Sequence, residues 1–298
     1  MSRALFLVPA ILLIAIFIIG PIAWTITLTF FSEEGVSPDN FAGLDNYETV
    51  LGSKDTFNVD DFPKWPPLGT FIHNAIWVAI HLPVSMFFGL FMALILRDVK
   101  GASIVKSAIF LGMVTPMIVG GVFIQFLLQS NAGIVPAFFG LVGVEELSGS
   151  WITNRRTVLF GLIFGSVWLW TGFSVIVYSA GLTTIPKEFF EAAKIDGTST
   201  LRMFTRITFP LLKPMTLVVL TMTLLWELKI FDIVFIATNV VGGPALGVGS
   251  GAADVLALQM YRYAFINGDF ALGSTVATLL TFLTLFAAIL MIRYMVKR

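Results

Sequence analysis

The residues best suited to chemistry form a short run of polar and aromatic side chains inside an apolar stretch, Trp226-Glu227-Leu228-Lys229-Ile230-Phe231-Asp232. Ionisable groups are costly inside a membrane helix, and they usually face a cavity or one another. Helical spacing places Lys229 and Asp232 at neighbouring positions, so these two charges could simply neutralise each other. They could instead line a path for a polar solute, and Gln125 in an earlier apolar stretch is a weaker candidate for that path.

Nucleophilic and metal chemistry find little support in the sequence. The chain has no cysteine, which removes thiolate nucleophiles and most structural zinc sites. Its two histidines, His73 and His81, have no third ligand near them, so no metal site is expected. No Gly-x-x-x-x-Gly-Lys-[Ser/Thr] phosphate-binding loop occurs, so ATP is not expected to bind this chain. No basic tract with interleaved aromatic residues indicates nucleic-acid binding.

Composition indicates an integral membrane protein of the all-α class. The 298 residues are 57% hydrophobic and 12% charged, with a net charge of +0 and a mean hydropathy of +0.92, whereas soluble domains carry about 25% charged residues. The first apolar run is longer than the ~7–15 residues of a signal-peptide core, so we expect a retained helix. Six stretches reach the ~20 residues that span a bilayer: Ala4–Phe30, Ile72–Leu96, Ser107–Leu128, Val158–Ala180, Pro214–Ile236 and Phe270–Met295.

The distribution of lysine and arginine predicts the orientation of this single membrane domain, residues 1–298. Most of these cations fall on the side that holds Arg97, Lys187, Arg202 and Arg293. The positive-inside rule makes that side cytoplasmic, with both termini inside the cell membrane. Residues 31–71 then form an acidic extracellular loop, which is either a solvated loop or a contact surface for an extracellular partner.

Residues 181–213 form a cytoplasmic loop with an unusual pattern. Pro186 suits the first turn of a short helix, and Gly197 is placed to end that helix with a positive φ. A second short helix follows, in which Arg202 and Arg206 share one face. Apolar side chains lie between the charges although they are outside lipid, so this segment either packs beneath its own membrane helices or docks another protein. These apolar residues are Phe189, Phe190, Ala192 and Ala193.

The segment resembles the EAA motif of ABC importer permeases. In that motif Glu-Ala-Ala is followed after three residues by Gly, and after nine more by Ile-x-Leu-Pro. Phe209 stands where the motif has Leu, and the flanking residues resemble the carbohydrate branch of the family. The likeness extends from Asn74 to Gly242-Gly243-Pro244 and the last helix. The matching residues are Glu191, Ala192, Ala193, Gly197, Ile207 and Pro210.

The resemblance implies a type I importer permease that works without a cofactor of its own and is not an enzyme. Its EAA helices would dock on a cytoplasmic ATPase and transmit its closure to the membrane helices. Expected partners are a second homologous permease, two ATPase subunits that bind ATP and Mg²⁺, and an extracellular solute-binding protein. The residues implied in coupling are Glu191, Ala192, Ala193, Gly197, Arg202 and Pro210.

The resemblance also implies a sugar as cargo, most closely a disaccharide or an α-glucoside. A sugar needs hydrogen bonds to its hydroxyls and an aromatic face, and Trp226, Glu227, Lys229 and Asp232, with Gln125, would supply them. Family members more often have Asn at the position of Lys229 and an uncharged residue at that of Glu227. The alternative is a proton-coupled secondary transporter with Glu227 or Asp232 as its proton site, although the inverted repeats common in such proteins are not evident.

Overall fold

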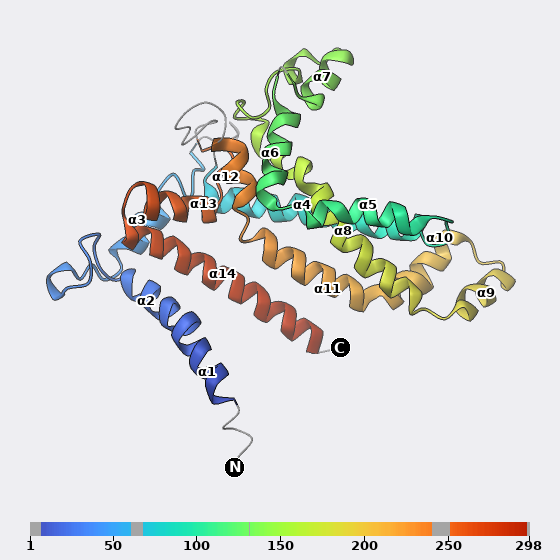
Figure 1. Ribbon diagram of the computed structural model, residues 1–298, viewed down its shortest axis with the longest axis horizontal. Helices are drawn as coiled ribbons and strands as arrows, with labels where there is room; N and C mark the ends of the chain where they lie inside the picture. Colours follow the sequence, from blue (N-terminus) through green and yellow to red (C-terminus); the bar gives the residue numbers. More distant parts are fainter. Residues whose placement is uncertain (1–6, 61–67, 131, 240–250, 297–298) are drawn as a thin grey trace.

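The computed structural model describes residues 7–60, 68–130, 132–239 and 251–296, and all regular structure in these ranges is helical (Figure 1). An isolated bridge between Phe31 and Phe41 is the one β-type pairing among them. The helices are α1 (Val8–Ile14), α2 (Gly20–Leu28), α3 (Asp45–Gly52), α4 (Thr70–Ile95), α5 (Ala102–Val114), α6 (Met117–Leu128), α7 (Ile134–Leu141), α8 (Val158–Thr183), α9 (Lys187–Ile195), α10 (Thr200–Met203), α11 (Phe209–Glu227), α12 (Asp232–Asn239), α13 (Leu256–Tyr261) and α14 (Phe270–Val296).

Five stretches of the described chain are long and apolar enough to cross a membrane, and a sixth exists if α5 and α6 count as one bent span. The all-α membrane class is therefore confirmed. The five are Val8–Leu28, Thr70–Ile95, Val158–Thr183, Thr200–Glu227 and Phe270–Val296.

The third predicted span, Ser107–Leu128, is not a straight helix. α5 and α6 are bent by 99° at the break between them, and Figure 1 shows α6 turning away from the line of α5. Thr115 and Pro116 both have extended backbone at this break. The ring of a proline disfavours helical geometry at the preceding residue, which explains why the helix ends there.

The fifth predicted span, Pro214–Ile236, was wrong at both ends. The helical stretch starts much earlier, at Thr200, and ends at Glu227. A turn follows before α12 begins at Asp232. Its bonds are of the tighter three-residue type, from Lys229 N to the Trp226 carbonyl at 3.1 Å and from Ile230 N to the Glu227 carbonyl at 3.2 Å. The polar run met in the sequence therefore lies at a break between two helices.

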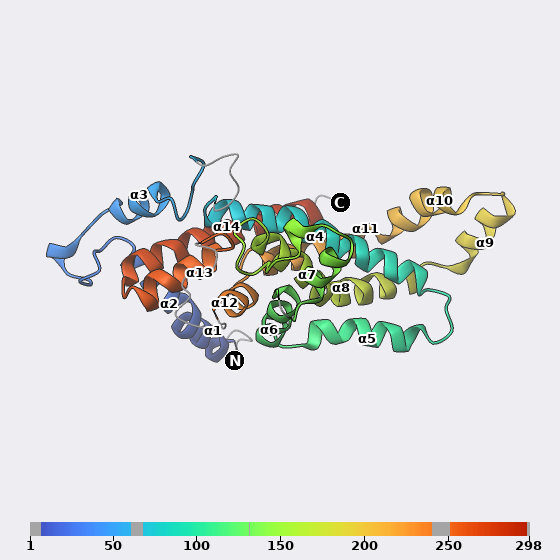
Figure 2. The ribbon, with the colours of Figure 1, turned by 90° about the horizontal axis from the view of Figure 1, so that it is seen from above.

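α8 forms the centre of the bundle. Its apolar window is 61% buried, against 0% for the first span, and α4 and α5 run beside it in Figure 2. Small residues allow this close packing. A Cβ added to Gly89 of α4 would stand 2.1 Å from Cβ of Ser174 in α8. Added Cβ atoms on Gly161 and Gly165 would stand 2.9 Å from Leu128 and Ile124 of α6, so these two glycines allow α8 and α6 to pack closely.

Candidate functional sites

A pocket of about 190 Å³ opens at the break between α11 and α12. Three residues predicted to line a solute path, Trp226, Lys229 and Asp232, come together in its wall. The other lining residues are Met117, Trp170, Ile230, Phe231 and Ile233. The break thus gathers an aromatic ring, a cation and an anion around one small space.

Lys229 and Asp232 are both exposed, and among the described residues no ion pair joins them. The alternative in which the two charges neutralise each other is therefore wrong. Asp232 is the first residue of α12, where the positive end of the helix dipole stabilises a carboxylate. Both charged groups remain available to a solute.

Aromatic packing holds Trp226 in place beside these charges. Its ring centroid lies 4.9 Å from that of Trp170 and 5.1 Å from that of Phe173, both on α8. Tilted and edge-to-face ring pairs at these distances are attractive beyond simple burial. One wall of the pocket is therefore a fixed aromatic surface.

Glu227 and Gln125, also predicted to line the path, lie elsewhere. Glu227 is fully buried, and its Oε1 lies 2.6 Å from Nδ1 of His81 on α4. Gln125 of α6 is 2% exposed, and neither residue lines the pocket. Helical geometry explains the outcome for Glu227, because it points about 100° away from its neighbour Trp226 and so meets α4.

Two neighbouring side chains of α4 also bond to other segments, and one of them, Asn74, reaches the break. Asn74 donates from Nδ2 to the Leu228 carbonyl at 3.3 Å and accepts at Oδ1 from Leu256 N at 2.8 Å. Nε2 of His73 accepts from Leu68 N at 3.0 Å, so Nδ1 carries the proton and donates to the Asp254 carbonyl at 2.8 Å. These contacts of α4 were not predicted from the sequence. The feature that could have indicated them is the presence of three polar side chains in one apolar span, those of His73, Asn74 and His81.

The part of the outer loop that precedes α4 is anchored to α13. Gln259 of α13 is bonded to Thr70 at 2.5 Å and to Thr56 at 2.8 Å. Nearby, Asp254 pairs with Arg262. Burial raises the pKa of Asp254 above its ordinary value, although Arg262 partly offsets this rise. Residues 53–60 and 68–71 of the predicted loop are thus ordered against the bundle.

At the opposite end of the molecule, α9 and α10 project from the bundle (Figure 1). One face of α9 is fixed, because Phe190 is 6% exposed and the Arg97 guanidinium lies 3.8 Å from its ring centre. Ala193 is also buried. The chain leaves α9 through Gly197, whose φ of +67° confirms the predicted helix stop. Of the other residues predicted in coupling, Glu191, Ala192, Arg202 and Pro210 are exposed.

Three large apolar side chains of this segment are exposed among its charged residues. Phe189 is 50% exposed, Ile195 87% and Leu201 74%. From Thr200 the chain runs as one helical stretch to Glu227, a length of about 42 Å at the rise of an α-helix. One continuous helical stretch, referred to below as the rod, therefore connects the α9–α10 segment to the pocket at the break. Among the described residues, no three His, Asp or Glu side chains gather where they could hold a metal ion.

The chain is similar to known transport proteins over most of its length. The family model described as "Binding-protein-dependent transport system inner membrane component" matches residues 85–298. A probable ABC transporter permease protein of Pyrococcus horikoshii is 50% identical over 291 residues, 97% of this chain and 96% of the relative. An alpha-glucoside transport system permease protein of Rhizobium meliloti is 29% identical, over 94% of this chain and 78% of its own length.

A solved structure shares the fold. It is that of a bacterial alginate ABC transporter in complex with an alginate pentasaccharide-bound periplasmic protein, and the similarity covers 97% of this chain and 91% of that chain. The TM-score is 0.74 at 18% sequence identity. The described helices, the matched family model and the similar permease of Pyrococcus horikoshii agree, and this chain belongs to the family of binding-protein-dependent transport system inner membrane components, the permease subunits of ABC importers.

Proposed function

We propose that this chain forms half of the path by which an ABC importer carries a sugar, either a disaccharide or an α-glucoside. The observation that supports the proposal is the pocket at the α11–α12 break, where the Trp226 ring stands beside Lys229 and Asp232. A sugar ring offers a C–H face to an indole and hydroxyls to charged groups, so the three side chains match its two kinds of surface. A similar permease is named for α-glucoside transport.

The other half of the path would come from a second, homologous permease. Two ATPase subunits would bind ATP and Mg²⁺ and hydrolyse the nucleotide, while this chain would remain without a cofactor and without catalytic chemistry. An extracellular solute-binding protein would deliver the cargo; the solved relative was captured with a periplasmic protein of this kind. Both termini and the α9–α10 segment would then be cytoplasmic.

The coupling surface in this proposal is formed by the exposed residues of α9 and α10, which include the apolar side chains of Phe189, Ile195 and Leu201. An ATPase that binds it would move α9, and Gly197 would pass the movement to the rod that starts at Thr200. The rod ends at the pocket, so closure of the ATPases would change access to the cargo. Family membership argues against the proton-coupled alternative, in which Glu227 or Asp232 would carry a proton.

Trp226→Ala tests the path. In proteoliposomes that contain the whole complex, this variant should take up cargo at least about tenfold more slowly, because the aromatic wall is lost. Trp226→Phe keeps an aromatic face and should retain most of the uptake. Subunit stoichiometry after purification controls for assembly. Native uptake by assembled Trp226→Ala complexes would reject the proposed path.

A further inference from the structure

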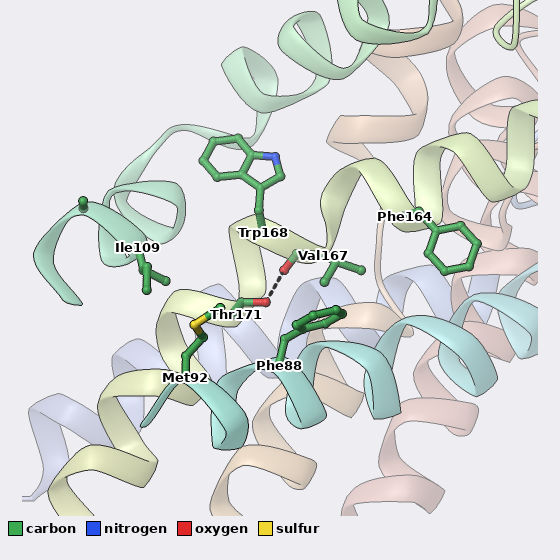
Figure 3. A pocket seen from close by; sticks show the side chains of 8 residues that line it. Phe88, Met92, Ile109, Phe164, Val167, Trp168 and Thr171 are labelled. Atoms are coloured by element: carbon green, nitrogen blue, oxygen red, sulfur yellow. Dashed lines mark hydrogen bonds between the residues drawn. The ribbon is translucent and has the colours of Figure 1, made fainter. Parts of the chain in front are cut away.

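Two cavities lie along the same three helices, α4, α5 and α8. The first is an apolar groove of about 360 Å³, walled by side chains that include Phe88, Ile109 and Trp168 (Figure 3). Its single hydroxyl, that of Thr171, donates to the Val167 carbonyl at 2.8 Å within α8. Apart from the indole N–H of Trp168, the rest of the lining is apolar, so the groove suits a hydrocarbon.

The second cavity, of about 330 Å³, lies at the end of the same helices that carries α9. Arg97, Lys106 and Lys187 all line it. Asp98 is the one acid in its lining, and that side chain is 89% exposed with a carboxylate oxygen 3.8 Å from Arg97 Nε. Positive charge is therefore in excess, and the cavity suits an anion.

A buried hydroxyl lies in the same cavity without a partner. Ser179 Oγ is inaccessible to solvent, and it makes no hydrogen bond to any described residue. Such groups are rare in folded proteins because each carries a desolvation cost.

The helical repeat joins the two cavities into one site. Lys106 and Ile109 are three residues apart on α5, so they lie on one face. Trp168 and Ser179 are eleven residues apart on α8, which is about three turns, so they also share a face and stand about 16 Å apart. On both helices, a residue of the groove therefore lies on the same face as a residue of the basic cavity.

We propose that this combined site binds a phospholipid with an anionic headgroup. The phosphate would contact Arg97, Lys106 and Lys187, and one acyl chain would lie in the groove beside Trp168. Basic cavities between membrane helices at the bilayer surface suit such headgroups, and each cation near the surface adds attraction. A soluble anion would leave the groove empty, and an apolar helix would leave the cations unpaired, so a phospholipid is the one occupant that fits both parts.

The site also touches the projecting segment. Lys187 is the first residue of α9, and Arg97 stacks on Phe190 of the same helix. A bound headgroup would therefore tie α9 to the ends of α4 and α5. The consequence for transport rests on the proposed coupling role of α9, whereas lipid binding itself does not.

The test is native mass spectrometry of the intact complex, delipidated in detergent and titrated with phosphatidylglycerol, phosphatidylcholine or inorganic phosphate. Phosphatidylglycerol should be retained in preference to phosphatidylcholine. The double variant Lys106→Gln/Lys187→Gln should lower its retention at least about tenfold, since two cations are removed. The matched double variant Lys100→Gln/Lys194→Gln removes two exposed lysines outside the cavity and should bind as the native complex does.

A second variant tests the groove independently of charge. Ala108→Phe fills the groove from α5 and should also lower phosphatidylglycerol retention. Three results would overturn the proposal: equal retention of the two lipids, native retention in Lys106→Gln/Lys187→Gln, or binding of inorganic phosphate with native lipid retention in Ala108→Phe. Lipid retention is measured without transport, so its outcome is independent of the sugar path that Trp226→Ala tests.

Discussion

The buried pair formed by His81 and Glu227 provides a quantitative test of how the α11–α12 break is held. Both side chains are 0% exposed, and the contact between Nδ1 and Oε1 is 2.6 Å. Nε2 of His81 and Oε2 of Glu227 have no other partner in the described part of the chain. Removal of either residue therefore leaves its counterpart buried and unpaired.

The expected energies follow from this burial. A buried polar group that loses its partner costs about 1–3 kcal/mol. Hydrogen bonds between membrane helices average only about 0.6 kcal/mol and reach about 1.7 kcal/mol. Because this bond is short and both groups are ionisable, we expect the upper part of that range. His81→Leu and Glu227→Leu should each lower the free energy of unfolding by about 1–3 kcal/mol, and the coupling energy between them should be about 1–2 kcal/mol.

A double-mutant cycle measures the coupling. The purified chain in mixed micelles is titrated with sodium dodecyl sulfate, and helix content is followed by circular dichroism. The double variant His81→Leu/Glu227→Leu should be more stable than the sum of the two single losses implies, because it leaves neither polar group unpaired. Additive losses, with a coupling energy below about 0.3 kcal/mol, would refute the reasoning.

Three further predictions concern other parts of the molecule. Gly197→Pro should abolish uptake without loss of membrane insertion, since proline cannot adopt a φ of +67°. The control variant Gly143→Pro, at a φ of +77° after α7, should keep most of the uptake. Equal uptake by the two variants would contradict the role of α9. Gly89→Ala should lower the free energy of unfolding by about 1–3 kcal/mol, because its Cβ would stand 2.1 Å from Ser174. In Gly140→Ala the added Cβ would stand 3.6 Å from Ser148, so this variant should change the free energy of unfolding little. Detergent titration of the two variants measures the difference. Burial raises the pKa of Asp254 above 3.8, so the folded chain binds the proton of this carboxyl more tightly than the unfolded chain does. The resulting contribution to the unfolding free energy is fully present below pH 3.8 and is lost as the pH rises through the raised pKa. Asp254→Asn should flatten this fall in unfolding free energy with pH, and an unchanged slope would be evidence against it.

Local chemistry made the α9 segment predictable. A glycine after a short amphipathic helix takes the positive φ that ends the helix, and Gly197 does so. Hydropathy over ~20 residues likewise located four membrane spans closely, because burial in lipid depends on composition alone. Pro116 gave a local signal for the break between α5 and α6, although hydropathy treated the two helices as one.

Tertiary contacts decided what the sequence left open. The helix break after Glu227 contains no glycine or proline, and it is held by Asn74 and His81 of α4. His81 and Glu227 are 146 positions apart, so no local pattern links them. Whether a polar residue in the run faces the pocket or α4 depends on that break: Lys229 lines the pocket, whereas Glu227 faces α4.

The central claim is that this permease moves cargo when partner ATPases close under the control of a solute-binding protein. The direct measurement is the ATPase activity of the purified complex in lipid, with empty binding protein and with binding protein loaded with an α-glucoside. We expect strong stimulation by the loaded protein and little by the empty one. No co-purifying ATPase, together with proton-driven uptake by this chain alone, would contradict it.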